Sequence, residues 1–466
     1  MDVIIVGAGS IGFQLAKRLI EENNNVILIE KDQDKANAAN EKLDCLVINE
    51  EGNNLDTLKR AKLKKADYFI SVTESDEINM LTCGMVASER SDIFKIAKVR
   101  NLHYFNTRLS GKSFLGIDHI INPEIEAARA IVKSIAHGAV SDIISFQNSD
   151  LQMRSYTVPQ NHKIADSTTE NLKHHLSTDF LLALIQRENS YIIPSGNTII
   201  RPHDKLFLLA SDKDFDTIFN ALGKTRRRMN KILVVGGGKI GSYIVGYLLD
   251  SQKNTPTPFH QFSKFFRQEV LKKVAVIDYD YKACKRMADT YPDALVLNAD
   301  ISDEGALEDE QIHNYDLIIT TTDNQELNII TAIYAKRLGV KRAIAKVTNN
   351  HYLKIASELD IDVPISQKIS VVNSILKSIR RKNVKSIHNI SGGDVEVIEL
   401  SVSDTSRCIG MSLNDIKFPP SSLILSIRRK EENIIPTGNI RIQADDSIIA
   451  IAQTRSMRKI ETLFTD

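Results

Sequence analysis

The sequence predicts an α/β protein in which two doubly wound parallel-sheet domains, each followed by a small α+β domain, form a tandem duplication. Two observations carry this prediction: the chain repeats itself internally, and in each copy short β-branched runs alternate with segments of helical periodicity. The units follow in the order A, B, A′ and B′. We place them at residues 1–138, 139–223, 231–385 and 386–466, with a charged linker at 224–230.

The duplication is clearest at a glycine-rich loop and in the sequence that follows it. VGAGSIG at Val6–Gly12 returns as VGGGKIG at Val235–Gly241, and Asp67–Leu81 matches Asp316–Ile330 without a gap. A single loop of this kind is a weak signal, but its recurrence in the same context is much more specific.

Unit A opens with a strand, a tight glycine turn and a helix. Val3–Val6 is a short apolar run typical of a buried parallel strand, and Ile11–Glu22 has helical periodicity. The first glycine permits the turn, the second lets a pyrophosphate approach, and the third lets the helix pack on the strand. Phosphates would meet free N–H groups at the helix N-terminus. This Rossmann-like phosphate loop comprises Gly7, Ala8, Gly9, Ser10, Ile11 and Gly12.

An acidic residue ends the second predicted strand, Val26–Ile29. Glu30 lies 18 positions after Gly12, where a carboxylate can accept hydrogen bonds from both ribose hydroxyls and would repel a 2′-phosphate. This favours NAD(H) over NADP(H). The alternative is a solvated charge at the end of a strand.

Further candidate ligand residues follow the remaining strands of unit A, because ligands of open α/β sheets bind at the carboxyl ends of the strands. Strands are expected at 45–48, 68–72 and 94–100. The residues that follow or end them are Glu51, Gly52, Asn53, Thr73, Glu74, Lys98 and Arg100. The two cations can neutralise phosphate, pair with acids or remain solvated. Asp76 and Glu77 can cap the next helix or contact a ligand.

Unit A′ repeats this pattern with two differences. Its phosphate loop comprises Gly236, Gly237, Gly238, Lys239, Ile240 and Gly241, and its strand-end acid is Asp278. Asp278 comes 37 positions after Gly241, so an insertion near 251–266 is expected to form a surface loop. Asp300, Thr322 and Lys346 correspond to Glu51, Thr73 and Lys98. Thr348 replaces Arg100, so the second site loses one positive charge and need not prefer the same nucleotide.

The B units are small modules of alternating apolar segments. Residues 180–185 match 422–427, a Gly-Asn turn follows in each, and then come strands at 206–210 and 448–452. Each module is expected to end in a helix.

Composition excludes several classes of protein. With 60 basic and 59 acidic residues the net charge is +1, so no overall field attracts nucleic acid. The four cysteines form no CxxC pair, which argues against a disulfide framework or a zinc site, and no metal is expected. No apolar run approaches the roughly 20 residues of a membrane span. We expect a cytoplasmic protein that can dock on a membrane partner.

The paired glycine loops, strand-end acids and repeated B modules resemble the tandem RCK family, to which the TrkA subunits of bacterial Trk potassium-uptake systems belong. The resemblance covers nearly the whole chain. It implies Rossmann-like A units, B units of the TrkA-C type, binding of NAD(H) and also of ATP or ADP, and assembly into a homo-oligomeric ring. It also implies a regulator attached to a potassium channel or transporter at the inner face of the membrane.

The resemblance assigns phosphate binding to Gly7–Ile11 and Gly236–Ile240, and ribose recognition to Glu30 and Asp278. Lys98, Arg100 and Lys346 occupy positions where the family commonly has basic residues near the nucleotide. Thr348 departs from that pattern.

Two other functions remain open. The glycine loops would also permit an NAD-dependent dehydrogenase, which needs a proton donor and a substrate pocket beside the nicotinamide. His103 and His351 recur, but no catalytic constellation surrounds them in the sequence, and we expect no enzyme. A scaffold with vestigial loops is opposed by the retention of both glycine triplets and both acids.

Overall fold

The computed structural model describes the chain except residues 108–113, 137–142, 147–148, 177, 189, 224–228, 251–272, 304, 306–307, 309, 380–383, 391–393, 431 and 466. The predicted surface loop at 251–266 and most of the predicted linker lie outside the described residues. The chain divides into two compact units, one of Met1–Ser141 with Arg227–Ile379 and one of Asp142–Arg226 with Arg380–Asp466. None of the described helices is both long and apolar enough to cross a membrane.

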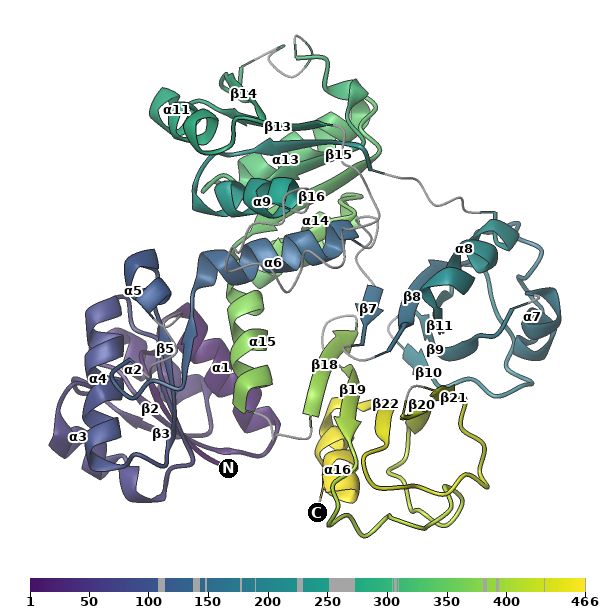
Figure 1. Ribbon diagram of the computed structural model, residues 1–466, viewed down its shortest axis with the longest axis horizontal. Coiled ribbons are helices and arrows are strands. Elements are labelled where there is room, and N and C mark those ends of the chain that lie inside the picture. The colour runs from purple at the N-terminus through teal and green to yellow at the C-terminus, as the bar shows by residue number, and fades with distance from the viewer. Residues whose placement is uncertain are drawn as a thin grey trace. The chain divides into compact units, whose positions relative to one another are not determined.

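The first sheet has six parallel strands in the order β3-β2-β1-β4-β5-β6, as predicted for a Rossmann-like domain (Figure 1). Its strands are β1 (Asp2–Val6), β2 (Asn25–Ile29), β3 (Leu46–Ile48), β4 (Tyr68–Ser71), β5 (Phe94–Lys98) and β6 (His119–Ile121). Its helices are α1 (Ser10–Glu21), α2 (Gln33–Lys42), α3 (Leu55–Arg60), η1 (Leu63–Lys65), α4 (Asp76–Glu89), α5 (Leu102–Thr107) and α6 (Pro123–Ala136).

The second sheet repeats this topology in the order β14-β13-β12-β15-β16-β17. Its strands are β12 (Lys231–Val235), β13 (Lys273–Asp278), β14 (Leu295–Asn298), β15 (Leu317–Thr320), β16 (Arg342–Val347) and β17 (Val363–Ser366). The helices are α9 (Lys239–Asp250), α11 (Tyr281–Thr290), η3 (Ile312–Asn314), α13 (Gln325–Arg337), α14 (Asn350–Glu358) and α15 (Gln367–Ile379). The predicted fold class is therefore confirmed for both A units.

The two sheets exchange their last helices. α6 follows the first sheet in sequence, yet its buried face joins the apolar core of the second sheet, where Ile131 and Ile135 pack with Ile244 and Leu248 of α9. Conversely, α15 follows the second sheet and contributes Ile375 to the core of the first sheet, beside α1. In Figure 1, α6 lies against α9 and α15 lies beside α1. Each glycine-loop helix is thus covered by a helix from the other half of the chain.

The B units form two five-stranded antiparallel sheets, in the orders β10-β9-β11-β8-β7 and β18-β19-β22-β20-β21. The strands are β7 (Ile143–Ser145), β8 (Leu151–Thr157), β9 (Leu181–Arg187), β10 (Ser190–Ile192), β11 (Lys205–Ser211), β18 (Val384–Ile390), β19 (Val395–Ser401), β20 (Ser422–Arg429), β21 (Glu432–Ile434) and β22 (Ser447–Gln453). The helices are α7 (Thr169–His175), α8 (Asp212–Ala221) and α16 (Thr454–Thr465). Both sheets contribute to one apolar cluster, and both modules end in a helix as predicted.

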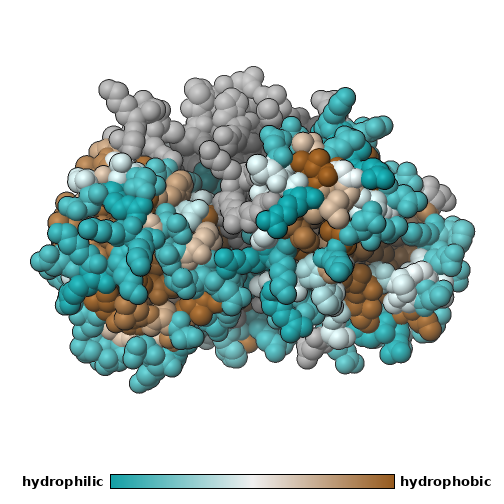
Figure 2. Space-filling view, turned by 90° about the horizontal axis from the view of Figure 1, so that it is seen from below, coloured by the Kyte–Doolittle hydropathy of each residue, from teal (hydrophilic) through white to brown (hydrophobic). Residues whose placement is uncertain are grey.

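Large apolar side chains are exposed at corresponding positions of the two A units. Leu81 on α4 and Ile330 on α13 are 53% and 64% exposed. Figure 2 shows that, on the face it draws, apolar residues lie in separate patches among hydrophilic ones.

Candidate nucleotide-binding sites

Both glycine loops have the same backbone geometry. Gly7 and Gly236 have φ angles of +102° and +103°, which favour glycine. A Cβ atom at Gly12 would collide with the carbonyl oxygen of Gly7, and one at Gly241 would collide with that of Gly236. These glycines therefore let the helix start directly against the turn.

The middle glycines have a different role. A Cβ atom at Gly9 or at Gly238 would meet no other atom within 4 Å, so the fold itself does not require glycine there. Gly9 is also the N-cap of α1 and no side chain caps it, which leaves N–H groups of the first turn open to a ligand. Open space in front of free N–H groups is what a phosphate needs.

The strand-end acids face the loops. The Glu30 carboxylate accepts hydrogen bonds from the backbone N–H of Ala8, at 2.6 Å, and of Asp32, at 2.9 Å. Asp278 accepts from Gly237 at 2.6 Å and from Asp280 at 2.8 Å. Glu30 is only 8% exposed, so it is not a solvated charge. Each carboxylate keeps lone pairs that ribose hydroxyls can use.

A cavity of about 360 Å³ opens at the carboxyl ends of β1, β2 and β4. These ends coincide because Val6 pairs with both Ile29 and Ser71. Eight predicted site residues line the cavity: Gly7, Gly9, Glu30, Glu51, Gly52, Asn53, Thr73 and Glu74. The sequence prediction missed Lys31, Asp32, Lys35, Glu50 and Ser75, which also line it. Its charged lining comprises five carboxylates and two lysines.

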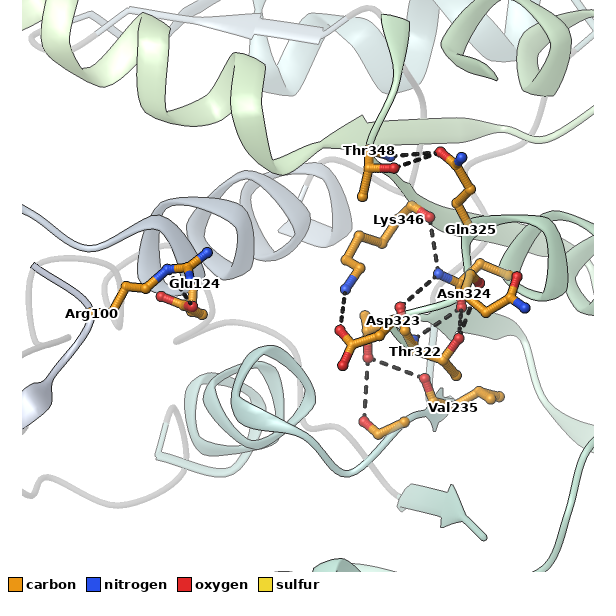
Figure 3. Close-up of polar contacts among 12 residues, drawn as sticks. Arg100, Glu124, Val235, Thr322, Asp323, Asn324, Gln325, Lys346 and Thr348 are labelled. Carbon is orange, nitrogen blue, oxygen red and sulfur yellow. Dashed lines mark hydrogen bonds and ion pairs between the residues drawn. The ribbon is translucent and has the colours of Figure 1, made fainter. Parts of the chain in front are cut away.

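The other predicted residues of the first site, Ala8, Ser10, Ile11, Gly12, Lys98 and Arg100, do not line this cavity. Of the loop residues, Ala8 donates its backbone N–H to Glu30. Lys98 is buried at the end of β5, and burial together with the charge of Arg100 lowers its pKa. The Arg100 side chain lies 3.6 Å from the carboxylate of Glu124, which is on α6 (Figure 3).

Two buried asparagines, Asn79 and Asn328, hold the loops beside the two candidate sites. In the sequence they are marked only by their matching positions in the repeated segments 67–81 and 316–330. The Asn79 amide accepts from the Thr73 N–H at 2.8 Å and donates to the Lys98 carbonyl at 2.9 Å. Asn328 accepts from the Thr322 N–H at 3.0 Å and donates to the Lys346 carbonyl at 3.0 Å. Each asparagine therefore fixes the ends of two neighbouring strands at the candidate site. Their recurrence was the available signal.

The second site has the same framework but different charged groups. Lys346 pairs with Asp323 at 3.2 Å, and Gln325 accepts hydrogen bonds from Thr348 (Figure 3). The predicted Asp300 accepts two hydrogen bonds from Ser302, which lower the pKa of Asp300.

The wall of the second site also differs from that of the first. A Cβ atom at Gly52 would collide with Val6, whereas the corresponding residue of the second unit is Ile301, which packs on the core. In the second phosphate loop, Ile240 is buried in the core, while Lys239 is exposed at the start of α9. The two sites are therefore related but not equivalent.

No group of three or more His, Cys, Asp or Glu side chains among the described residues is placed to hold a metal ion.

Comparison with known proteins agrees with this division into repeats. The TrkA-N domain model matches residues 3–123 and 261–367, and the TrkA-C domain model matches residues 153–223 and 397–465. The Trk system potassium uptake protein TrkA homolog 1 of Methanosarcina mazei is 28% identical over 470 residues, covering 100% of both chains. TrkA of Halomonas elongata is 27% identical over 470 residues, covering 100% of this chain and 98% of its own.

Solved structures share the fold. The GsuK RCK domain has a TM-score of 0.56 at 16% identity, covering 99% of this chain and 94% of its own. The GsuK channel bound to NAD has a TM-score of 0.55 at 16% identity, covering 99% of this chain and 78% of its own.

Proposed function

The chain belongs to the TrkA family, whose members join TrkA-N and TrkA-C domains, and we propose that it is a nucleotide-sensing regulatory subunit of a Trk-type potassium channel or transporter. It would act in the cytoplasm, attached to the membrane through that partner, as part of a homo-oligomeric ring. One observation carries the proposal. A single compact unit contains two glycine loops, and in each of them the strand-end acid is hydrogen-bonded to the loop.

NAD(H) is the nucleotide that the first site supports best. The fixed Glu30 carboxylate suits two ribose hydroxyls and would repel a 2′-phosphate. The five carboxylates of the cavity also disfavour a highly charged triphosphate more than a dinucleotide diester. The GsuK channel of similar fold has been solved with NAD bound. ATP and ADP remain competing ligands, because Lys31 and Lys35, which line the cavity, can respond to phosphate number.

Regulation requires that a nucleotide bind two arrangements of the protein with different affinity. The exchanged helices supply a physical link for this, because α6 joins the end of the first sheet to the helix of the second glycine loop. The Arg100–Glu124 pair lies at the start of that link. A dehydrogenase is less well supported, because His103, the histidine of the first unit that recurs in the sequence, is not among the described residues that line the cavity.

Calorimetric titration of the full chain with NADH, NAD, ATP and ADP tests this function. Two sites should be seen, with one lost in Gly9→Val and the other in Gly238→Val, while Glu30→Ala and Asp278→Ala weaken the corresponding site. Absorbance at the NADH band should stay constant when oxidisable substrates are added. Unchanged binding in the Gly9→Val/Gly238→Val double variant would refute the site assignment, and steady NADH oxidation would favour the dehydrogenase.

A further inference from the structure

The loops after the two strand-end acids are held in the same way. Asn49 donates from its amide to the Glu30 carbonyl at 2.8 Å, and Asn298 donates to the Asp278 carbonyl at 3.0 Å. Asn298 donates also to the Tyr279 carbonyl at 3.0 Å. Together with the bonds to the acid side chains, these contacts fix the backbone on both sides of the residue that follows each acid.

That residue differs between the units. In the first unit it is Lys31, which lines the cavity beside Glu30. In the second unit it is Tyr279, whose side chain is 76% exposed and has no polar or ring contact among the described residues. Because the two loops share their anchoring, Tyr279 stands at the rim of the second site where Lys31 stands at the first.

We propose that Tyr279 stacks on the purine base of the nucleotide whose ribose is held by Asp278 and whose phosphates are held by the second glycine loop. The inference rests on the proposed function, because it assigns a contact with the base of the nucleotide that the second site is proposed to bind. A phenol ring offers a flat apolar face, and stacking a base on an aromatic side chain contributes about 1–3 kcal/mol. Its fixed backbone and two side-chain torsions make the ordering cost small.

The same comparison sets the two sites apart. Lys31 and Lys35 present ammonium groups at the first site, whereas the corresponding residues of the second unit are Tyr279 and Ala283. Binding at the second site should therefore depend more on the base of the nucleotide than binding at the first.

The test is titration with ADP of the full-length Gly9→Val protein, in which the first site is blocked. Tyr279→Ala should weaken ADP binding roughly 5- to 150-fold, the range that corresponds to loss of one stacked base. Tyr279→Phe, which keeps the ring, should bind within twofold of the Gly9→Val parent. The matched control is Tyr281→Ala, because Tyr281 is 69% exposed two residues away and its counterpart Gln33 does not line the first cavity. Tyr281→Ala should leave ADP affinity unchanged.

A spectroscopic readout separates stacking from a structural effect. The chain has 12 tyrosines and no tryptophan, so its emission comes from tyrosine. Stacking should quench part of this emission when ADP is added, and the quenching should be lost in Tyr279→Phe although ADP still binds. Equal binding by Tyr279→Ala and its parent, or equal losses in the Tyr279 and Tyr281 variants, would overturn the proposal. If the Gly9→Val parent binds no ADP, NAD or NADH at all, both this proposal and the assignment of the second site fail together.

Discussion

Individual glycines at the two loops have separable roles. Gly12 touches the carbonyl of Gly7 so closely that no side chain fits, whereas Gly9 faces open space. The motif in the sequence predicted the loop, but it does not distinguish the glycine that packs the fold from the one that admits the ligand. That distinction depends on distances across the turn.

The contrast gives the first prediction. Gly12→Val should unfold or strongly destabilise the first A unit, because the side chain overlaps backbone that cannot move away. Gly9→Val should keep the melting temperature within a few degrees of wild type and lose nucleotide binding at the first site. Calorimetry and thermal melting of both variants provide the check. A Gly9→Val protein that binds NADH within twofold of wild type would contradict the assignment.

Lys133 on α6 gives a prediction about pH. Burial, and then the charge of Lys377 on α15, lower the pKa of Lys133 to about 8. In an unfolded chain the pKa of lysine is about 10.4. Between these values the unfolded chain binds the extra proton, so this lysine makes the free energy of unfolding rise as pH increases from about 8 to about 10.4. Below pH 8 the destabilising effect of its charge is complete.

Replacing this charge should therefore stabilise the protein at neutral pH. Lys133→Met should raise the free energy of unfolding at pH 7 by at most about 3 kcal/mol and change it little at pH 10.5. Urea denaturation of variant and wild type at both pH values measures the difference. An equal effect at both pH values would show that packing, and not charge, is responsible.

At the scale of elements, the alternation of strands and helices was predictable because it is encoded locally. The exchange of α6 and α15 was not, since an apolar helix face does not specify which of two similar sheets it covers. The roles of Asn79 and Asn328 were hidden for a related reason: each connects strand ends that are distant in the sequence.

The exchange of helices predicts which sheet is destabilised by a substitution in α6. Ile131 is fully buried in the core of the second sheet, so Ile131→Ala should cost about 2–5 kcal/mol there. Hydrogen exchange should show lost protection in β12, β13 and α9. The reciprocal control is Ile375→Ala on α15, which should loosen β1, β2 and α1 instead. Lost protection confined to the sheet that precedes each helix in the chain would contradict the exchange.

At the scale of the whole molecule, the duplication makes a prediction about a fragment. A fragment of residues 1–141 would contain neither α15, which packs against α1, nor α9, which packs against α6. Both α1 and α6 would therefore expose an apolar face. Because α1 and α9 are equivalent helices, α6 of one copy can cover α1 of another, and the fragment should sediment as a dimer. Ile131→Asp should break that dimer. A stable, soluble monomer of residues 1–141 would show that the exchanged helices are not needed to close the cores.

Potassium flux through the membrane partner is the property that a nucleotide-gated regulator must change. Rubidium uptake should be measured in proteoliposomes that contain the Trk-type membrane subunit of the same organism, with the full chain added and with NADH, NAD, ATP or ADP present. We expect at least one nucleotide to change the rate several-fold with the wild-type chain. The Gly9→Val/Gly238→Val protein should associate with the membrane subunit but give no nucleotide response. A rate that stays constant at nucleotide concentrations that calorimetry shows to fill the sites would contradict a nucleotide-gated regulator.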